Sequence, residues 1–390
     1  MRKKVIMACI HPYSSVYQVG SQHIARQFIK NGYDVAYISS PLSPFHILKR
    51  PDKELFDRFE IYRRGGEYCC NNRLWQYVPF SLITPVNKPL LGSEYVVNKW
   101  KNMCLPNLTQ KLKLKGYDKV DVFYFDNPLA FPLLENVNCR TSVFRIMDMH
   151  SGFPNYPKVF KTLIKKIQGS VDLVVYSAKL LKSYAKQFTN KREPLHMPNG
   201  IDFDSFTEGS RQVPGAIRHI SKPIAVYVGS LETWFDFELV AFAAMKLPEI
   251  SFLIIGPRNN HSQQLQKLEN VHMIGAVDHK MLQAYLYNCK VGIIPFNIRR
   301  YPELINSVNP LKLYEYMACG LPVVAMEWDE IKSLRSPALL CKTREKFVEA
   351  ISKTAQIQVD KNIFINYAKK NSWENSFLNV FKEIQTIQSG

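Results

Sequence analysis

The sequence predicts an α/β protein with two similar, doubly wound domains, and three observations support this fold class. Short apolar runs rich in Val and Ile recur without polar–apolar alternation, which is typical of parallel strands covered on both faces. Helical patterns separate these runs, and alternating strands and helices build doubly wound sheets. A polar, Gly-containing stretch at 199–222 interrupts the alternation of strand and helix patterns once, and it indicates a linker between two domains.

The expected strands follow one another through both halves of the chain. They lie at 4–10, 34–39, 120–125, 141–148 and 171–177, and then at 224–230, 251–256, 271–276, 291–296 and 321–326. Helical spacing occurs at 22–30, 160–168, 179–187, 237–245 and 279–288. Residues 63–119 are basic and partly aromatic, and their periodicity is weak.

One further helix is predicted in the stretch NPLKLYEYMACGLPVVA, at 309–325. Pro310 suits the first turn of a helix, and Gly320 suits its C-terminal cap. A helix N-terminus offers unpaired N–H groups to a phosphate. Lys312 could therefore meet a phosphate while Glu315 accepts hydrogen bonds from ribose hydroxyls. The alternative is a surface salt bridge between these two residues, which are three positions apart.

Length and composition limit the class of protein. A chain of 390 residues accommodates two ordinary domains, and 46% hydrophobic with 22% charged residues is a globular composition. No apolar run approaches the ~18 residues of a membrane-spanning helix. The apolar run at 5–10 is too short for a secretory signal and is expected to form the first strand. Eight cysteines without C-x-x-C spacing favour free thiols and a cytoplasmic location.

The net charge of +18 is concentrated in the first half of the chain. Residues 1–200 hold 30 Lys and Arg against 14 Asp and Glu, a balance of +16, and residues 201–390 hold 21 against 19, a balance of +2. This asymmetry favours an anionic partner for the first half, such as a membrane leaflet, a phosphorylated lipid or a nucleic acid. A basic surface that serves only solubility is the alternative.

Asp148 is the candidate catalytic residue, because it ends the run TSVFRIMD. A carboxylate at the C-terminal end of a parallel strand lies where open α/β sheets bind ligands, and it could act as a general base. A turn or helix-cap role is the alternative. Asp126 has a similar position but precedes Asn-Pro, which favours a turn. With only His150 nearby, Asp148 has too few neighbours for a metal site, so no metal is expected.

The second half contains candidate ligand-binding residues at its strand ends. Gly229 and Ser230 follow one strand and could bring backbone amides to a phosphate. Phe296 follows another and could stack on a nucleobase, although core packing is its ordinary role. Arg258, Arg299 and Arg300 are candidate cations for a phosphate or a sugar carboxylate. The sequence has no G-x-G-x-x-G after its first strand and no P-loop motif, which argues against a dinucleotide dehydrogenase and a P-loop enzyme.

These residues resemble a known family. The segments GSL, LIIGP, GIIPF, NPLKLYEYMACGLPVVA and NSWE look like the C-terminal domain of a GT-B glycosyltransferase of the group 1 type. MPNGIDFDSF is similar to the segment that leaves the first domain in that family, and FRIMD resembles the strand and aspartate of bacterial polysaccharide glucuronosyltransferases of the xanthan type. The sequence departs from the family's E-x-F-G-x-x-x-x-E pattern, since Ser307 stands at the first glutamate and only Glu315 is retained.

The resemblance implies a GT-B architecture in which two Rossmann-like domains face each other across a cleft. Residues 1–198 with 373–390 would bind the acceptor, and residues 223–372 would bind the nucleotide-sugar. Lys312 would contact the diphosphate, Glu315 the ribose and Phe296 the base. The remaining contacts would come from Gly229, Ser230, Arg258, Arg299 and Leu311, with Asp148 as the base of an inverting displacement.

The function implied is metal-independent transfer of a hexosyl group from a UDP-sugar to a lipid-linked or other saccharide acceptor, in surface polysaccharide biosynthesis. Glucuronate is a candidate sugar, because an arginine can pair with its carboxylate. No cofactor and no nucleic acid is expected. Charge suggests peripheral association with the inner face of the cell membrane. The alternatives are a nucleotide-sugar epimerase of the same fold and a basic nucleic-acid-binding protein.

Overall fold

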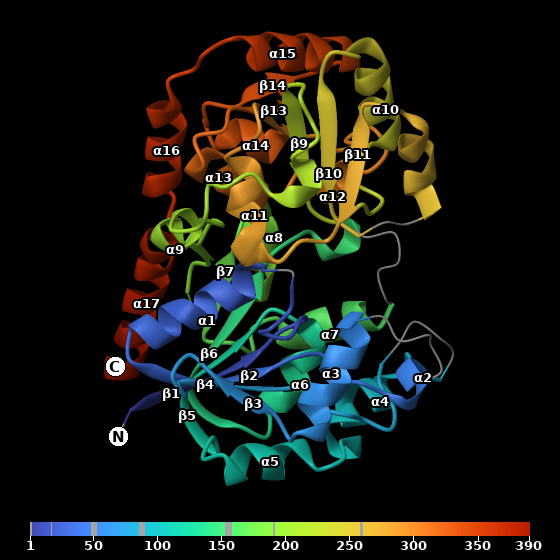
Figure 1. Ribbon diagram of the computed structural model, residues 1–390. Helices are drawn as coiled ribbons and strands as arrows, with labels where there is room; N and C mark the ends of the chain where they lie inside the picture. The colour runs from blue at the N-terminus through green and yellow to red at the C-terminus, as the bar shows by residue number, and fades with distance from the viewer. Residues whose placement is uncertain are drawn as a thin grey trace. The chain divides into compact units, whose positions relative to one another are not determined.

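The computed structural model describes residues 2–16, 18–47, 53–85, 90–152, 158–189, 192–257 and 260–390, and it divides into two compact units (Figure 1). Unit 1 contains Met1–Ser177, Leu181–Met197 and Phe377–Gly390. Unit 2 contains Ala178–Leu180 and Pro198–Ser376. The stretch 199–222, expected to be a linker, belongs to unit 2 and includes helix α9 (Phe203–Thr207).

Unit 1 is built on a sheet whose strands, within the described residues, follow the order β3-β4-β2-β1-β5-β6-β7-β8. All neighbouring strands are parallel except β3 and β4. The strand order reverses between β1 and β5, which are the central pair. The strands are β1 (Lys3–Ala8), β2 (Tyr33–Ile38), β3 (Glu67–Cys69), β4 (Leu74–Tyr77), β5 (Lys119–Phe125), β6 (Asn138–Ile146), β7 (Leu173–Tyr176) and β8 (Leu195–His196).

Each apolar run of the first half forms a strand, as predicted: β1, β2, β5, β6 and β7. The sequence did not indicate β3, β4 or β8, because they are short and have no apolar run of their own. The helices are α1 (Gly20–Lys30), α2 (Pro44–Ile47), α3 (Lys53–Arg63), α4 (Glu94–Lys99), α5 (Leu108–Leu114), α6 (Phe131–Leu134), α7 (Lys158–Ile167) and α8 (Lys182–Ala185). The helix expected at 179–187 is α8 with a 3₁₀ turn on each side.

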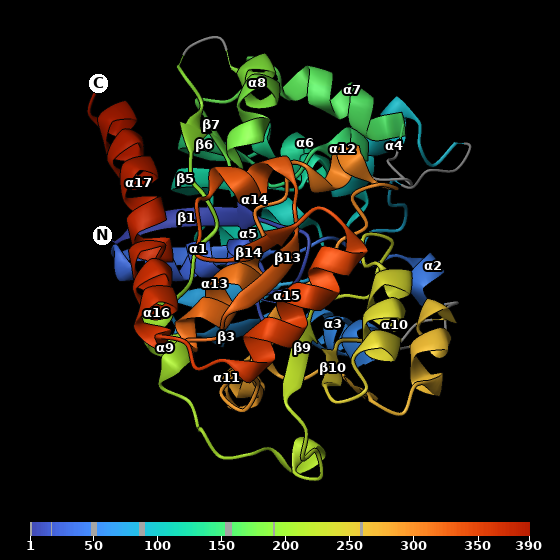
Figure 2. The ribbon, with the colours of Figure 1, turned by 90° about the horizontal axis from the view of Figure 1, so that it is seen from above.

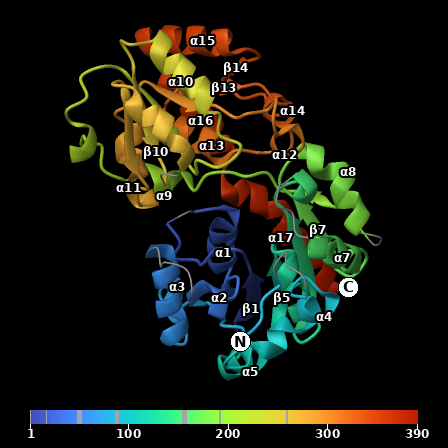
Figure 3. The same cartoon turned by 90° about the vertical axis from the view of Figure 1, so that its right-hand side faces the viewer.

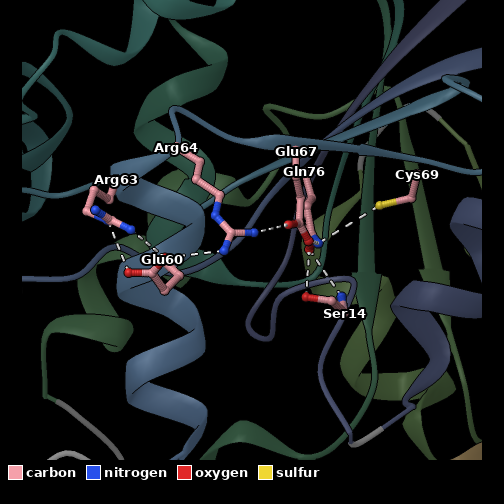
Figure 4. A network of polar contacts seen from close by, with 7 residues as sticks. All are labelled: Ser14, Glu60, Arg63, Arg64, Glu67, Cys69 and Gln76. Atoms are coloured by element: carbon pink, nitrogen blue, oxygen red, sulfur yellow. Dashed lines mark hydrogen bonds and ion pairs between the residues drawn. The ribbon is translucent and has the colours of Figure 1, made fainter.

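A polar network holds the β3–β4 hairpin in the weakly periodic region (Figure 4). Gln76 of β4 accepts hydrogen bonds from the Ser14 backbone N–H, at 3.1 Å, and from its hydroxyl, at 3.3 Å. It also donates to Glu67 of β3. Arg64 pairs with both Glu67 and Glu60, and so links the hairpin to α3. The hairpin and the loop after β1 are thus tied by polar contacts, which no hydrophobic pattern reveals.

Unit 2 is built on a sheet that, in the described ranges, is parallel throughout, in the order β11-β10-β9-β12-β13-β14. Its order reverses between β9 and β12. The strands are β9 (Ile224–Val228), β10 (Ser251–Ile255), β11 (Val271–Gly275), β12 (Val291–Ile294), β13 (Val323–Met326) and β14 (Leu339–Cys341). The sequence predicted all of these except β14.

Helices cover both faces of this sheet. On one face α10 (Phe237–Lys246) lies beside α15 (Arg344–Gln356), as Figure 2 shows. On the other face α13 (Leu311–Ala318) packs with α16 (Lys361–Lys370) and with α9, near α11 (His279–Leu286) (Figure 3). Two short helices, α12 (Pro302–Ile305) and α14 (Asp329–Ser333), follow β12 and β13. The doubly wound fold class is confirmed for both units.

The C-terminal helix α17 (Trp373–Ser389) contributes its last residues to unit 1. The Phe377 ring lies 5.0 Å from the ring of Phe28 in α1, edge to face. Arg192 pairs with Glu383 at 2.8 Å. Within the described ranges, none of the helices is long and apolar enough to cross a membrane, and all eight cysteines are free.

Removal of the Phe377 ring is expected to destabilise unit 1 strongly, because this side chain is 2% exposed. Phe377→Ala should lower the free energy of unfolding by about 3–5 kcal/mol. The neighbouring Leu378 is 48% exposed, so Leu378→Ala should change it by only about 0.5 kcal/mol. Urea unfolding of both variants measures the difference; equal losses would show that the helix does not belong to this core.

Candidate active site

The loops at the strand-order reversal of unit 2 contain several of the expected residues. Ligands of open α/β sheets bind outside the carboxyl ends of the strands at such a point. Gly229 follows β9 with a φ of +140°, which favours glycine, and its N–H donates to the Ile255 carbonyl at 2.9 Å. A Cβ on Gly256 would lie 2.0 Å from the Gly229 carbonyl oxygen. Both glycines therefore allow two strand ends to approach closely.

Lys312 of α13 lies against this loop. Its Nζ is 5.2 Å from the centre of the Tyr227 ring and 4.8 Å from that of Phe296. A Cβ on Gly229 would lie 3.4 Å from Lys312 Cε and 3.6 Å from Nζ. Burial lowers the pKa of the Lys312 ammonium to about 8, with the nearby Glu315 acting in the opposite direction. A partly desolvated cation beside a glycine loop is well suited to an incoming anion.

Hydrogen bonds fix α13 to the sheet. The Tyr316 hydroxyl accepts from the Val228 N–H, at the end of β9, at 2.7 Å. The Tyr314 hydroxyl donates to Asn309 Oδ1 at 2.9 Å. The C-cap of the helix is Cys319, and Gly320, which was expected to be the cap, follows it with a φ of +70°. Pro310 is the N-cap rather than the first helical residue. The position of Lys312 is thus set by buried tyrosines on its own helix.

Glu315 contacts a histidine that the sequence did not indicate. His279 Nε2 lies 2.8 Å from Glu315 Oε1, and the two residues are 36 positions apart. The His279 ring also packs against Phe206 of α9, 5.3 Å between centroids. Because His279 begins α11, the Glu315 carboxylate is held from a second helix. Its expected contact with a ribose stays a prediction.

Phe296 is a core residue. Its ring is 4% exposed and packs against Trp328 at 5.2 Å, while its backbone bridges to Phe235. Core packing, the ordinary role of a phenylalanine at such a position, is therefore confirmed for Phe296. The Phe296 ring also contacts the Lys312 ammonium. Its contact with a nucleobase stays a prediction.

The remaining expected residues are spread around these loops. Ser230 is half-buried, and its carbonyl accepts from the Tyr227 hydroxyl at 2.9 Å. Leu311 is half-buried at the start of α13, and Arg299 is exposed. Arg258 lies outside the described residues. A cavity of about 620 Å³ borders the same loops and is lined by residues that include Asp236, Glu238, Lys267, Asn297, Arg300 and Tyr301.

Asp148 follows β6 in unit 1 and is half-buried. Burial raises the pKa of its carboxyl group to about 6, and the positive charge of Arg145 opposes this rise. A carboxylate with this pKa accepts a proton near neutral pH more readily than an ordinary aspartate. Nearby, His150 Nδ1 lies 3.2 Å from the Tyr184 hydroxyl, and burial lowers the pKa of its ring to about 4. This imidazole is neutral at pH 7.

Asp126 does not form the expected turn. The neighbouring Asn127 does so, because its side chain accepts from the Leu129 N–H at 3.0 Å. Asp126 is 1% exposed and accepts a hydrogen bond from the Ser21 hydroxyl of α1. Burial raises the pKa of its carboxyl group, whereas the Ser21 hydrogen bond and the charge of Arg145 act against the rise. Asp126 therefore belongs to a buried polar cluster at the strand-order reversal of unit 1.

Sequence reasoning missed the residues that support the candidate side chains: Tyr227, Tyr316, His279 and Arg145. Tyr227, Tyr316 and Arg145 lie in apolar runs or on buried helix faces, where a pattern analysis treats them as core. His279 had only one signal, its place at the start of a predicted helix. Tyr316 and His279 bind Val228 and Glu315, which are distant in sequence, so spacing alone could not identify these contacts.

Two family descriptions match separate parts of the chain. Residues 7–177 match the N-terminal domain of the glucuronosyltransferase GumK. Residues 222–356 match the group 1 glycosyl transferases. The second match contains the loops after β9 and β12 and helix α13; the first contains Asp126 and Asp148.

The chain is also similar to a curated protein, TuaH of Bacillus subtilis (strain 168), which is named as a glycosyltransferase of teichuronic acid biosynthesis. The two are 28% identical over 187 residues, which is 46% of this chain and 46% of TuaH. The match thus spans about half the length of that relative.

Solved structures share the fold over the whole chain. Sucrose-phosphate synthase from Thermosynechococcus elongatus superposes with a TM-score of 0.68 at 14% identity, covering 100% of both chains. Trehalose-6-phosphate synthase from E. coli, bound with UDP-2-fluoro glucose, has a TM-score of 0.67 at 12% identity and covers 98% of this chain and 99% of its own. Anabaena HepE, in complex with UDP and glucose, has a TM-score of 0.62 at 13% identity and covers 98% and 100%. Residues 222–356 thus resemble the group 1 glycosyl transferases and residues 7–177 resemble the N-terminal domain of GumK, and the chain shares the GT-B fold of these solved structures.

Proposed function

We propose that this glycosyltransferase moves a sugar from a UDP-sugar to a lipid-linked or other saccharide acceptor during assembly of a surface polysaccharide. The observation that carries the proposal is the contact of Lys312 with the Gly229 loop at the strand-order reversal of unit 2. A nucleotide diphosphate is the anion that this position suits best. The relationship to TuaH supports the polysaccharide context.

Unit 2 would stabilise the leaving group. The Lys312 ammonium and the N-terminal N–H groups of α13 would meet the diphosphate, and Glu315, held by His279, would accept from the ribose hydroxyls. As the bond to the sugar breaks, negative charge grows on the diphosphate. Fixed donors there lower the barrier without needing a metal ion, and loss of one donor typically costs about 3–4 kcal/mol.

Unit 1 would supply the base. An acceptor hydroxyl would attack the anomeric carbon while Asp148 takes up its proton, and the bond from that carbon to the UDP oxygen would break. This single displacement would invert the configuration at the anomeric carbon of the sugar. The raised pKa of Asp148 supports this role, because a stronger base removes the hydroxyl proton more effectively.

Glucuronate is the donor sugar we favour. The match to the N-terminal domain of GumK, named as a glucuronosyltransferase, supports it. Arg299 and Arg300 are exposed beside the loop after β12, and a guanidinium can bind the sugar carboxylate through two hydrogen bonds.

Unit 1 would also bind the inner face of the cell membrane peripherally. Support comes from the balance of +16 in residues 1–200 and from exposed apolar side chains on this unit, among them Phe45, Ile47, Phe56, Tyr95 and Leu114. Each Lys or Arg near an anionic surface contributes roughly 1 kcal/mol.

Substitution of Asp148 tests the base. Asp148→Asn should reduce transfer of label from UDP-[¹⁴C]glucuronate to a lipid extract by at least about 10²-fold, because the amide cannot accept the proton. In the native enzyme, activity should rise with pH through about 6, since the carboxylate must be ionised. UDP affinity, measured by calorimetry, should stay unchanged. Near-native transfer by this variant would rule out Asp148 as the base.

Lys312 is expected to make UDP binding sensitive to pH. The ammonium is charged below its pKa of about 8 and neutral above it, so affinity should fall as the pH rises from 7 to 9. Lys312→Met should weaken UDP binding about 10–100-fold at pH 7, the loss of one hydrogen bond to a charged group. Lys312→Arg should retain the charge and remove the alkaline fall.

The exposed Lys353 of α15 provides the control for this titration, and Lys353→Met should bind UDP as the native chain does. Equal pH dependence in the native and Lys312→Arg chains would contradict the role of Lys312.

Sedimentation with anionic vesicles tests the membrane claim. Binding should be strong at low salt and largely lost at 1 M salt, where the Debye length is about 3 Å. Absence of salt-sensitive binding would refute it.

A thermal-shift screen of UDP- and GDP-sugars identifies the donor. Turnover of the selected nucleotide-sugar without an acceptor would indicate an epimerase instead. Competition by DNA or RNA rather than UDP would indicate a nucleic-acid-binding protein.

A further inference from the structure

The cavity of about 620 Å³ in unit 2 has walls from three separate segments of the chain. Residues 232–238 follow β9, residues 263–267 follow β10, and residues 297–301 follow β12. Ligands of open α/β sheets bind outside the carboxyl ends of the strands, where such segments meet. The volume also falls in the range of roughly 300–1,000 Å³ that small-molecule pockets have.

Hydrogen bonds hold two of these walls together. The Asp236 N–H donates to the Pro295 carbonyl at 2.8 Å, and the Asn297 N–H donates to the Trp234 carbonyl at 2.8 Å. The Asp236 side chain also caps α10, because it accepts from the Leu239 N–H at 2.9 Å. The protein's own backbone therefore sets the shape of the cavity.

The cavity adjoins the loops that the Lys312 ammonium contacts. The ring of Phe235, which lines the cavity, lies 4.6 Å from the Tyr227 ring, and that ring lies 5.2 Å from Lys312 Nζ. Phe296, the other ring beside the ammonium, directly precedes the lining residue Asn297. In a nucleotide-sugar the sugar is bonded directly to the diphosphate. A cavity this near to the candidate diphosphate contact is therefore in the right place for the sugar.

Charged side chains of both signs line the cavity. Lys267, from the wall after β10, and Arg300, from the wall after β12, are exposed cations. Glu232 and Glu238, both from the wall after β9, are exposed carboxylates. Within the described part of the chain these four side chains form no ion pairs with one another. The Arg300 guanidinium lies 5.6 Å from the centre of the Tyr301 ring. Cations and carboxylates are thus both available to a ligand.

A uronic acid is the ligand whose chemistry matches this lining. A carboxylate only accepts hydrogen bonds, and an ammonium or guanidinium only donates them, whereas a hydroxyl does both. A sugar ring with several hydroxyls can therefore bind groups of both kinds. A free phosphate would satisfy the cations alone and would be repelled by the carboxylates. The carboxylate of a uronic acid adds a charged partner for the cations, and a guanidinium can bind it through two hydrogen bonds.

We propose that this cavity is the subsite for the sugar ring of the donor, and that Lys267 and Arg300 select a uronic acid by binding its carboxylate from two walls. The proposal rests on the nucleotide-sugar transfer given under the proposed function. It gives Lys267 a part in specificity. Of the two arginines after β12 it assigns the carboxylate to Arg300, because Arg300 lines the cavity.

The test compares the binding of UDP-glucuronate and UDP-glucose, whose sugars differ in a carboxylate against a hydroxymethyl group. Lys267→Met and Arg300→Met should each weaken binding of UDP-glucuronate about 10–100-fold in calorimetry, the loss of one hydrogen bond to a charged group. Affinity for UDP-glucose should change much less, and affinity for UDP should stay unchanged. The preference for the acidic sugar should therefore fall in both variants. Both side chains are exposed, so these substitutions leave the core intact.

Two more variants complete the comparison. Lys267→Arg should keep most of the preference, because it retains the positive charge. Lys246, an exposed residue in the last turn of α10, provides the control, since it is outside the cavity lining. Lys246→Met should bind UDP-glucuronate and UDP-glucose as the native chain does.

An unchanged ratio of the two affinities in both Met variants of the cavity would overturn the inference, as would tighter binding of UDP-glucose than of UDP-glucuronate by the native chain. A rise only in the KM for the acceptor, with binding of UDP-glucuronate intact, would assign the carboxylate to the acceptor and would also overturn it. Failure of the proposed function is a different result, because the native chain would then bind neither UDP nor a UDP-sugar.

Discussion

The contact between the Lys312 ammonium and the rings of Tyr227 and Phe296 is the interaction on which the candidate site depends. An ammonium that is partly removed from water loses hydration, and the two ring faces replace only part of it. The ammonium lies beside Gly229, where a Cβ would be only 3.6 Å from Nζ. Tyr316 and His279 hold α13 and Glu315 in position around this cation. Packing of apolar rings thus prepares a polar site.

The two sheets use the same topological position in different ways. In unit 2, the strand end after β9 is glycine backbone, and Lys312 of α13 lies beside it. In unit 1, the corresponding strand ends are occupied by the protein's own groups: Asp126 accepts from Ser21, and Gly20 fits against Arg145. The first reversal point therefore holds a buried carboxylate of the protein itself, whereas the second presents backbone and a cation. One architecture, present twice, thus places a lysine beside glycine backbone in one unit and a buried carboxylate in the other.

The sequence predicted the central strands of both sheets because buried parallel strands need continuous apolar runs, which are visible without any partner. It did not predict β3, β4, β8 or β14. These strands lie at the sheet edges or, for β4, next to one; they are short, and polar contacts such as those of Gln76 help to hold them. Among the candidate residues, Gly229, Phe296 and Lys312 come together around one loop. The sequence could not reveal the His279–Glu315 contact, because it joins two helices whose packing is decided only in three dimensions. Asp126 was misjudged for a related reason: its partner Ser21 lies 105 positions earlier in the chain.

The course of the chain through the two units has a consequence for biosynthesis. Phe377 and the residues after it complete the core of a unit that begins at the other end of the sequence. The ribosome must therefore synthesise the entire second unit before the first can bury Phe28 fully. Until then the apolar surface around Phe28 stays exposed in the nascent N-terminal unit. Exposed apolar surface of this kind is what chaperones bind. Premature termination anywhere before residue 377 would leave unit 1 without part of its core.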